Sequence, residues 1–255
     1  MGIGSGIVSD SSPLDEWREC LLKARFLTNP PPPFSLLETL LFDPREGYLY
    51  LEEHLERLAT SADYLGRVCD LQKVRTKLDE CGLTFSGSTC MRVRLLVGDD
   101  GEPTIEALEC ELPRALSLHQ ARTLRGQPLA LTDFASQATD SFSPWLFHKT
   151  TRREIYDEAW RQAGSEGLID LIFCNQKGEV TEGAISNIIV EEDGSFFTPP
   201  LESGVLPGVM RKILLAAEGE YAIEERVLYQ DDLIRADRIY LCNSVRGVVE
   251  VELRS

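Results

Sequence analysis

Four consecutive prolines, Pro30 to Pro33, constrain the fold of this chain more strongly than any other feature of its sequence. Proline lacks an amide N–H, and its ring disfavours the helical conformation of the residue before it, so neither a helix nor an interior strand can run through this segment. A run of prolines adopts an extended conformation and serves as a stiff spacer. We therefore predict a linker at residues 28–33 that separates residues 1–27 from the rest of the chain.

Composition and charge exclude several classes of protein. With 255 residues, of which 43% are hydrophobic and 27% charged, the chain is typical of globular proteins and long enough for two modest domains. It has no apolar run that could span a bilayer and no signal peptide, so we expect no membrane partner. The net charge of −16 disfavours nucleic acid as a partner. Seven scattered cysteines without a C-x-x-C pair disfavour a disulfide framework or a metal site, and they favour a reducing, cytoplasmic location.

After the prolines, strand patterns alternate with helix patterns. Residues 91–97 alternate between apolar and mostly basic side chains, and the hairpin turn Gly98–Gly101 follows. Apolar residues from Leu51 to Leu65 recur at helical spacing. We also expect strands near 34–42, 48–51, 168–174, 185–190, 195–198, 238–242 and 248–252, helices at 151–163 and from Val209, and an interdomain crossing at 113–145. This order predicts a mixed α/β fold with a small domain at 34–115 and a larger domain at 116–255.

Lys149 and Glu182 are the pair with the clearest chemical meaning. Lys149 follows the apolar segment Pro144–Phe147, which would desolvate its ammonium group and lower its pKa toward use as a nucleophile. Glu182 lies in a short polar segment between two expected strands. A surface lysine and a hairpin glutamate are the ordinary alternatives. Together, however, an imine-forming lysine and a carboxylate beside a pyridine nitrogen are what a pyridoxal phosphate (PLP) enzyme needs.

Other segments could bind a phosphate or a carboxylate. Gly208 precedes an expected helix, whose first N–H groups would face an anion. Arg57 lies between core leucines of its helix. It could bind a phosphate through its guanidinium group, or it could simply extend from a half-buried face to solvent. Ser244 and Arg246 follow the expected strand 238–242. Ser244 could donate to phosphate and Arg246 could bind a substrate carboxylate, or both could simply form a turn.

Taken in order, these segments resemble those of the fold-type IV PLP-dependent enzymes, which include branched-chain aminotransferases, D-amino acid aminotransferases and aminodeoxychorismate lyases. The resemblance covers the chain from about Phe34 to its end. It is carried by the segments His54–Leu58, Lys149–Thr151, Glu179–Asn187, Thr198–Arg211 and Cys242–Ser244. It implies a two-domain α/β fold, PLP in the cleft between the domains, and a homodimer with active sites near the interface.

The resemblance also implies roles for particular residues. Lys149 would be the Schiff-base lysine and Glu182 the partner of the pyridine nitrogen. The phosphate would be held by Arg57, by the N–H groups of Val209 and Met210, and by Ser244.

Two positions depart from the family pattern. The aminotransferases commonly have a tyrosine five residues after the lysine, in contact with the cofactor's phenolic oxygen, where this chain has Glu154. Either Tyr156 makes that contact from the next turn or the contact is missing. Met210 replaces a threonine that is often found there, so a hydroxyl contact is lost while the N–H group remains.

Within the family, the lyase branch is the closer resemblance. Residues 4–24 resemble the closing segment of chorismate-utilising synthases, which many bacteria fuse through a linker to an aminodeoxychorismate lyase. Residues 34–40 and 243–247 also resemble the lyases. The implied activity is PLP-dependent conversion of 4-amino-4-deoxychorismate to 4-aminobenzoate and pyruvate for folate synthesis, with a synthase remnant at 1–27. Lys149 would then be the general base, Thr39 the proton donor to the leaving group, and Arg246 a carboxylate anchor.

Two alternatives remain open. A fold-type IV aminotransferase of branched-chain or D-amino acids would use the same cofactor residues and would respond to those amino acids. A non-catalytic module of a split synthase would bind no cofactor and would associate with synthase subunits.

Overall fold

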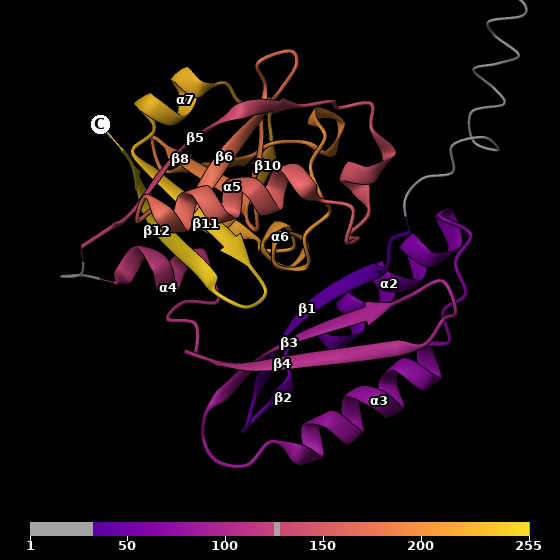
Figure 1. Ribbon diagram of the computed structural model, residues 1–255. Coiled ribbons are helices and arrows are strands. Elements are labelled where there is room, and N and C mark those ends of the chain that lie inside the picture. Colours follow the sequence, from indigo (N-terminus) through magenta and orange to yellow (C-terminus); the bar gives the residue numbers. More distant parts are fainter. Residues whose placement is uncertain (1–32, 125–127, 255) are drawn as a thin grey trace, which may run out of the picture. The chain divides into compact units, whose positions relative to one another are not determined.

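Residues 33–124 and 128–254 are described by the computed structural model, so the predicted remnant at 1–27 and most of the linker at 28–33 lie outside the described residues. From Ser35 onward the chain forms one compact unit that contains two β-sheets (Figure 1).

The first sheet has four strands in the order β2-β1-β3-β4, all antiparallel. Two helices supply apolar side chains to the core on one of its faces. Val93 and Leu95 of β3 are buried in this core, whereas Arg92 and Arg94 lie on the opposite, exposed side of the strand. The alternation in residues 91–97 therefore separates a core face from a basic face. The elements are β1 (Leu36–Asp43), β2 (Gly47–Tyr48), α2 (Leu51–Tyr64), α3 (Leu71–Thr84), β3 (Cys90–Val97) and β4 (Pro103–Cys110).

The second sheet has eight strands in the order β10-β9-β8-β11-β12-β5-β6-β7. Its strands are β5 (Ala130–Thr139), β6 (Asp170–Asn175), β7 (Val180–Gly183), β8 (Asn187–Glu192), β9 (Ser195–Thr198), β10 (Ile223–Glu225), β11 (Arg238–Asn243) and β12 (Gly247–Leu253). The helices packed on it are α4 (Leu118–Thr123), α5 (Glu154–Ser165), α6 (Val209–Leu215) and α7 (Gln230–Arg235), with a short 3-10 helix η1 (Pro144–Phe147) before Lys149.

The predicted mixed α/β fold is confirmed, and most expected elements lie within a few residues of those observed. The expectation of an interdomain crossing at residues 113–145 is wrong. Residues 113–145 contain β5, an interior strand between β12 and β6, in place of an uninterrupted interdomain crossing. Polar residues are interspersed along the strand, and the buried Thr132 satisfies its hydroxyl on the Asp170 carbonyl at 2.9 Å. The division into domains at 115/116 stays a prediction, although the two sheets fall on either side of it.

The segment that carries Lys149 runs against the start of β1. Leu37 N donates to the Lys149 carbonyl and Thr151 N to the Ser35 carbonyl, both at 2.9 Å. These hydrogen bonds fix the backbone at Lys149 and Thr151 relative to the first sheet. None of the described helices is long and apolar enough to cross a membrane.

Candidate functional site

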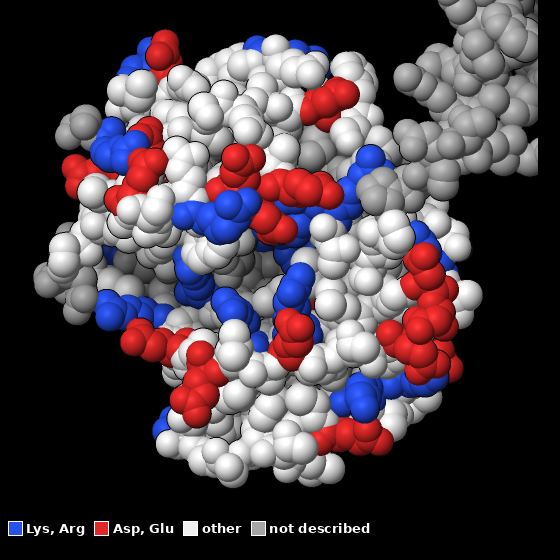
Figure 2. All heavy atoms as spheres, in the orientation of Figure 1, with Lys and Arg blue, Asp and Glu red and all other residues white. Residues whose placement is uncertain are grey.

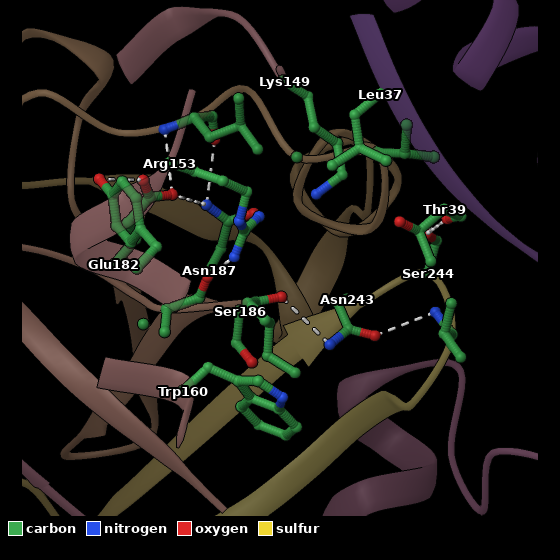
Figure 3. A pocket seen from close by; sticks show the side chains of 18 of the residues that line it. Leu37, Thr39, Lys149, Arg153, Trp160, Glu182, Ser186, Asn187, Asn243 and Ser244 are labelled. Carbon is green, nitrogen blue, oxygen red and sulfur yellow. Dashed lines mark hydrogen bonds between the residues drawn. The ribbon is translucent and has the colours of Figure 1, made fainter. Parts of the chain in front are cut away.

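A pocket of about 440 Å³ lies between the first sheet, the Lys149 segment, β7, α5, α6 and the turn from β11 to β12 (Figure 3). All the residues assigned to the site from sequence line this pocket: Thr39, Arg57, Lys149, Tyr156, Glu182, Val209, Met210, Ser244 and Arg246. Their individual roles remain predictions.

Lys149 extends its amine into the pocket, as Figure 3 shows. Burial lowers the pKa of Lys149 to about 7, and the nearby charges of Arg153 and Arg57 act in the same direction. Glu38 and Glu182 oppose this shift. A substantial fraction of Lys149 is therefore a neutral amine near pH 7, which is the state that a nucleophile or a general base requires.

Glu182 lies near the end of β7 with 5% of its surface exposed. Its carboxylate accepts from the Tyr156 hydroxyl at 2.9 Å and from Leu206 N at 3.1 Å. Burial raises the pKa of Glu182 to about 7, although the Tyr156 and Leu206 donors and the charge of Lys149 lower it. A carboxyl group with this pKa can share a proton with a ring nitrogen placed beside it.

Asn187 links Glu182 to the start of α6. Its side-chain amide donates to the Leu206 carbonyl at 3.0 Å and to Glu182 Oε2 at 3.4 Å. The carboxamide oxygen lies so close to the α-carbon of Gly208 that a Cβ on Gly208 would overlap it. Glycine is thus required at the residue that precedes α6, where the N–H groups of Val209 and Met210 have no acceptor within the helix.

Arg57 is bound by Glu38 of β1. Its Nε and Nη2 atoms donate to the two oxygens of Glu38 at 2.8 and 2.6 Å, and Nη1 donates to the Pro207 carbonyl at 3.2 Å. His54 contacts the same carboxylate at 2.7 Å. Burial alone would raise the pKa of Glu38, but the Arg57 charge lowers it to about 2. Arg57 is therefore held beside the loop before α6, with two of its five N–H groups uncommitted to these partners.

Ser244 and Thr39 lie next to each other across the pocket from Glu182 (Figure 3). The Ser244 hydroxyl donates to the Thr39 carbonyl at 3.2 Å, and this bond joins the turn after β11 to β1. Ser244 is buried and Thr39 is partly exposed. Two residues far apart in sequence are thus placed at one side of the same cavity.

Several cationic residues of the pocket were not recognised from the sequence. Arg92 and Arg94 project from the exposed face of β3, and Arg152 and Arg153 directly follow the Lys149 segment. The alternation in β3 and the Arg-Arg pair after Lys149 were visible signals, but nothing in them showed that both elements border one cavity. In Figure 2, Lys and Arg side chains gather around a hollow on one face of the molecule.

Residues 35–253 match the amino-transferase class IV family. The chain belongs to that family. A Schizosaccharomyces pombe protein provisionally named an aminodeoxychorismate lyase is 29% identical over 218 residues, which are 84% of this chain and 87% of that protein.

Solved class IV structures show the same fold. A Mesorhizobium loti protein provisionally described as an amino-acid aminotransferase is 32% identical with a TM-score of 0.75, and the match covers 87% of this chain and all of that one. A hypothetical aminotransferase from Mycobacterium tuberculosis in its PLP-bound form is 25% identical with a TM-score of 0.68, covering 86% and 81% of the two chains.

The cofactor of this class IV protein is PLP, and the pocket has the chemistry to hold it. It offers an amine of lowered pKa, a buried carboxylate with its own hydrogen-bond donors, and a loop before α6 that only glycine can complete. Within the described residues, no group of three or more His, Cys, Asp or Glu side chains could hold a metal ion.

Proposed function

We propose that this class IV enzyme is a 4-amino-4-deoxychorismate lyase, which releases 4-aminobenzoate and pyruvate. One observation carries the proposal: seven cationic side chains and two carboxylates are found among the described residues that line the pocket, in a chain whose net charge is −16. The cations are Arg57, Arg92, Arg94, Lys149, Arg152, Arg153 and Arg246, and the carboxylates are Asp157 and Glu182.

This local charge favours a polyanionic substrate. Glu38 and Glu106, which do not line the pocket, pair with Arg57 and Arg94, and the cofactor phosphate would account for a further part of the excess. Arg92, Arg152 and Arg246 remain without an ion pair among the described residues. Aminodeoxychorismate carries two carboxylates, whereas a branched-chain amino acid carries one carboxylate and an apolar side chain. A cavity bordered by guanidinium groups can pair with both carboxylates of aminodeoxychorismate, whereas a branched-chain amino acid would leave part of the cavity's positive charge unpaired. The likeness to the S. pombe protein, which bears a lyase name, supports the same choice.

The residues on the two sides of the cavity would have different roles in the reaction. When bound, PLP supplies an aromatic ring that stores the electrons released as the substrate C–H bond breaks. Glu182 would hold negative charge toward the ring nitrogen of the bound cofactor, and Tyr156 and Leu206 orient its carboxylate. The neutral amine of Lys149 accepts the proton from the substrate carbon that bears the amino group.

On the opposite side, the leaving group needs a proton and the substrate needs an anchor. We assign the proton donation to Thr39 Oγ1, because Thr39 lines the pocket and its backbone is fixed by Ser244. Arg246 would bind a substrate carboxylate. We assign the phosphate to Arg57, to the N–H groups of Val209 and Met210, and to Ser244, all of which line the cavity.

The decisive experiment is an assay for 4-aminobenzoate and pyruvate released from enzymatically generated aminodeoxychorismate. We expect equimolar release by the PLP-loaded protein, and a loss of about a thousandfold or more in Lys149→Ala. Lys77→Ala on the surface of α3 is the matched control and should leave the rate unchanged. No release from protein that retains the visible absorbance of bound PLP would rule out the lyase.

An aminotransferase acting on branched-chain or D-amino acids is the second candidate, favoured by the likeness to the M. loti structure, which bears an aminotransferase description. It predicts that these amino acids transfer their amino group to 2-oxoglutarate, measured as glutamate. Glutamate formation without release of 4-aminobenzoate would establish this candidate in place of the lyase.

We also propose a cytoplasmic homodimer whose residues 1–27 are the end of a fused synthase. Light scattering of the purified protein tests the dimer. A mass of about 28.6 kDa, that of one chain, would contradict it.

A further inference from the structure

Two arginines of the pocket lie over tryptophan rings. The guanidinium carbon of Arg152 is 4.4 Å from the centre of the Trp145 ring, and that of Arg246 is 4.8 Å from the centre of the Trp160 ring. All four residues line the cavity and are partly buried. The two pairs come from different segments. Trp145 belongs to η1 and Trp160 to α5, so the same arrangement occurs twice around one pocket.

Three of the other arginines of the pocket are paired with carboxylates, whereas Arg92 has no ion pair among the described residues but is exposed to solvent. Arg57 is bound to Glu38, Arg153 donates to Asp157 at 2.8 Å, and Arg94 lies 3.5 Å from Glu106. Within the described chain, by contrast, neither Arg152 nor Arg246 has a carboxylate at ion-pair distance. Asp170 acts on the charge of Arg246 only from beyond ion-pair distance. A cation in a partly buried site without a directly paired counter-ion is unfavourable unless an anion binds there.

A stacked guanidinium is well suited to bind that anion. The ring attracts the positive charge and holds the plane of the group, while the N–H donors on its edge stay available for a carboxylate. Arg246 is fixed further by one bond from Nη1 to the Ile169 carbonyl at 3.2 Å. Arg152 is fixed through its backbone, because its N–H donates to Thr150 Oγ1 at 3.2 Å. Each arginine is therefore tied to its own part of the pocket wall.

We propose that Arg152 and Arg246 are two separate carboxylate anchors, one for each carboxylate of a dicarboxylate substrate, and that Trp145 and Trp160 orient them. The proposal rests on the proposed function and deepens it, because it makes the distance between two carboxylates a condition for binding. The cyclohexadiene carboxylate and the enolpyruvyl carboxylate of aminodeoxychorismate would occupy one anchor each.

Two unreactive probes separate the anchors. Chorismate has both carboxylates but a hydroxyl in place of the amino group, and 4-hydroxybenzoate keeps only the ring carboxylate. Calorimetry on the PLP-loaded protein would compare both probes in the wild type, Arg152→Gln, Arg246→Gln and the double variant. Arg161→Gln, on the exposed side of α5, is the matched control.

Each single variant should weaken chorismate binding about tenfold or more, as expected for loss of a charge-assisted hydrogen bond. The double variant should lose about a hundredfold, because separate anchors contribute independently. Only one of the two single variants should weaken 4-hydroxybenzoate binding, and Arg161→Gln should change neither probe. Trp145→Phe and Trp160→Phe, which keep both arginines, should each weaken chorismate binding by a smaller factor of about two to five.

Several results would overturn the proposal. Chorismate affinity within about twofold of wild type in either arginine variant would show a single anchor or none. An equal effect of both variants on 4-hydroxybenzoate would show that both arginines act on one carboxylate. These outcomes differ from failure of the lyase assignment. If the anchors behave as expected but no 4-aminobenzoate forms from aminodeoxychorismate, the dicarboxylate site is supported and the lyase assignment is contradicted.

Discussion

The hydroxyl of Tyr156 donates to Glu182 Oε1 at 2.9 Å. The family resemblance leaves open whether this tyrosine contacts the cofactor's phenolic oxygen. In the structure its hydroxyl bonds to the carboxylate proposed for the ring nitrogen. Burial and the Glu182 charge raise the pKa of Tyr156, so it remains a donor at any ordinary pH. The hydrogen bond from Tyr156 therefore favours the ionised form of Glu182, against the effect of burial.

Tyr156→Phe should raise the pKa of Glu182 further, because the hydrogen bond from Tyr156 lowers it in the wild type. Fewer Glu182 side chains are then ionised near pH 7, and PLP affinity should fall about tenfold. The pH above which PLP binds tightly should move upward. Titration of the visible absorbance of bound PLP between pH 6 and 9 measures both effects, with Tyr64→Phe on the exposed face of α2 as the control. An unchanged pH profile would show that the Tyr156 bond does not set the ionisation of Glu182.

Gly208→Ala tests the backbone before α6. The added methyl would overlap the Asn187 carboxamide and displace it from Leu206 and Glu182. We expect PLP affinity to fall about tenfold or more, since the displaced amide leaves a buried carboxylate less well held. Gly164→Ala, where the new methyl meets nothing within 4 Å, should keep PLP affinity and gain up to about 1 kcal/mol of stability from helix propensity. Equal PLP affinity in the two variants would contradict the requirement for glycine at 208.

The candidate site could be proposed from sequence because its residues lie in short segments that, taken in order, resemble those of the fold-type IV enzymes. Lys149, Glu182 and Ser244 are each ordinary for their local segment, and only the ordered set indicates a cofactor site. All of them line one cavity, although their separation in sequence exceeds thirty residues in each case. Their roles rest on the assays proposed above.

The residues that were missed depend on contacts between distant segments. Glu38 is a single carboxylate in the mostly apolar strand β1, and only the packing of α2 on that sheet shows that it binds Arg57. The sequence around Arg152 and Trp160 does not show that both residues border one cavity, because this depends on where the Lys149 segment and α5 pack. The strand β5 was missed because polar residues are interspersed along it, including a buried threonine whose hydroxyl is satisfied on a neighbouring strand.

Glu38→Gln should destabilise the protein by about 3–5 kcal/mol at pH 7, because it leaves the Arg57 charge partly buried without its counter-ion. The lowered pKa of Glu38, about 2, means that this stabilisation is fully present above the unfolded value near 4.5 and is lost as the pH falls toward 2. Urea unfolding at pH 7 and at lower pH should therefore show a difference between variant and wild type that shrinks with acid. Adding Arg57→Met should restore part of the loss, and a double variant no more stable than Glu38→Gln would argue against the pair.

Lys149→Met should stabilise the PLP-free protein in a pH-dependent way. The folded pKa of Lys149 is lowered to about 7 from 10.5, so between these values the unfolded chain binds more protons and the stability of the wild type rises with pH. Methionine removes this dependence. The gain in stability of Lys149→Met over the wild type should be largest near pH 6.5, at several degrees in Tm, and should decline toward pH 10.

Thermal unfolding across that pH range measures this gain. Lys77→Met, which replaces an exposed lysine on α3, is the control and should show no such trend. A Lys149→Met advantage that is constant with pH would mean that the variant gains stability by packing alone, and that Lys149 carries its charge in the folded protein as it does in water.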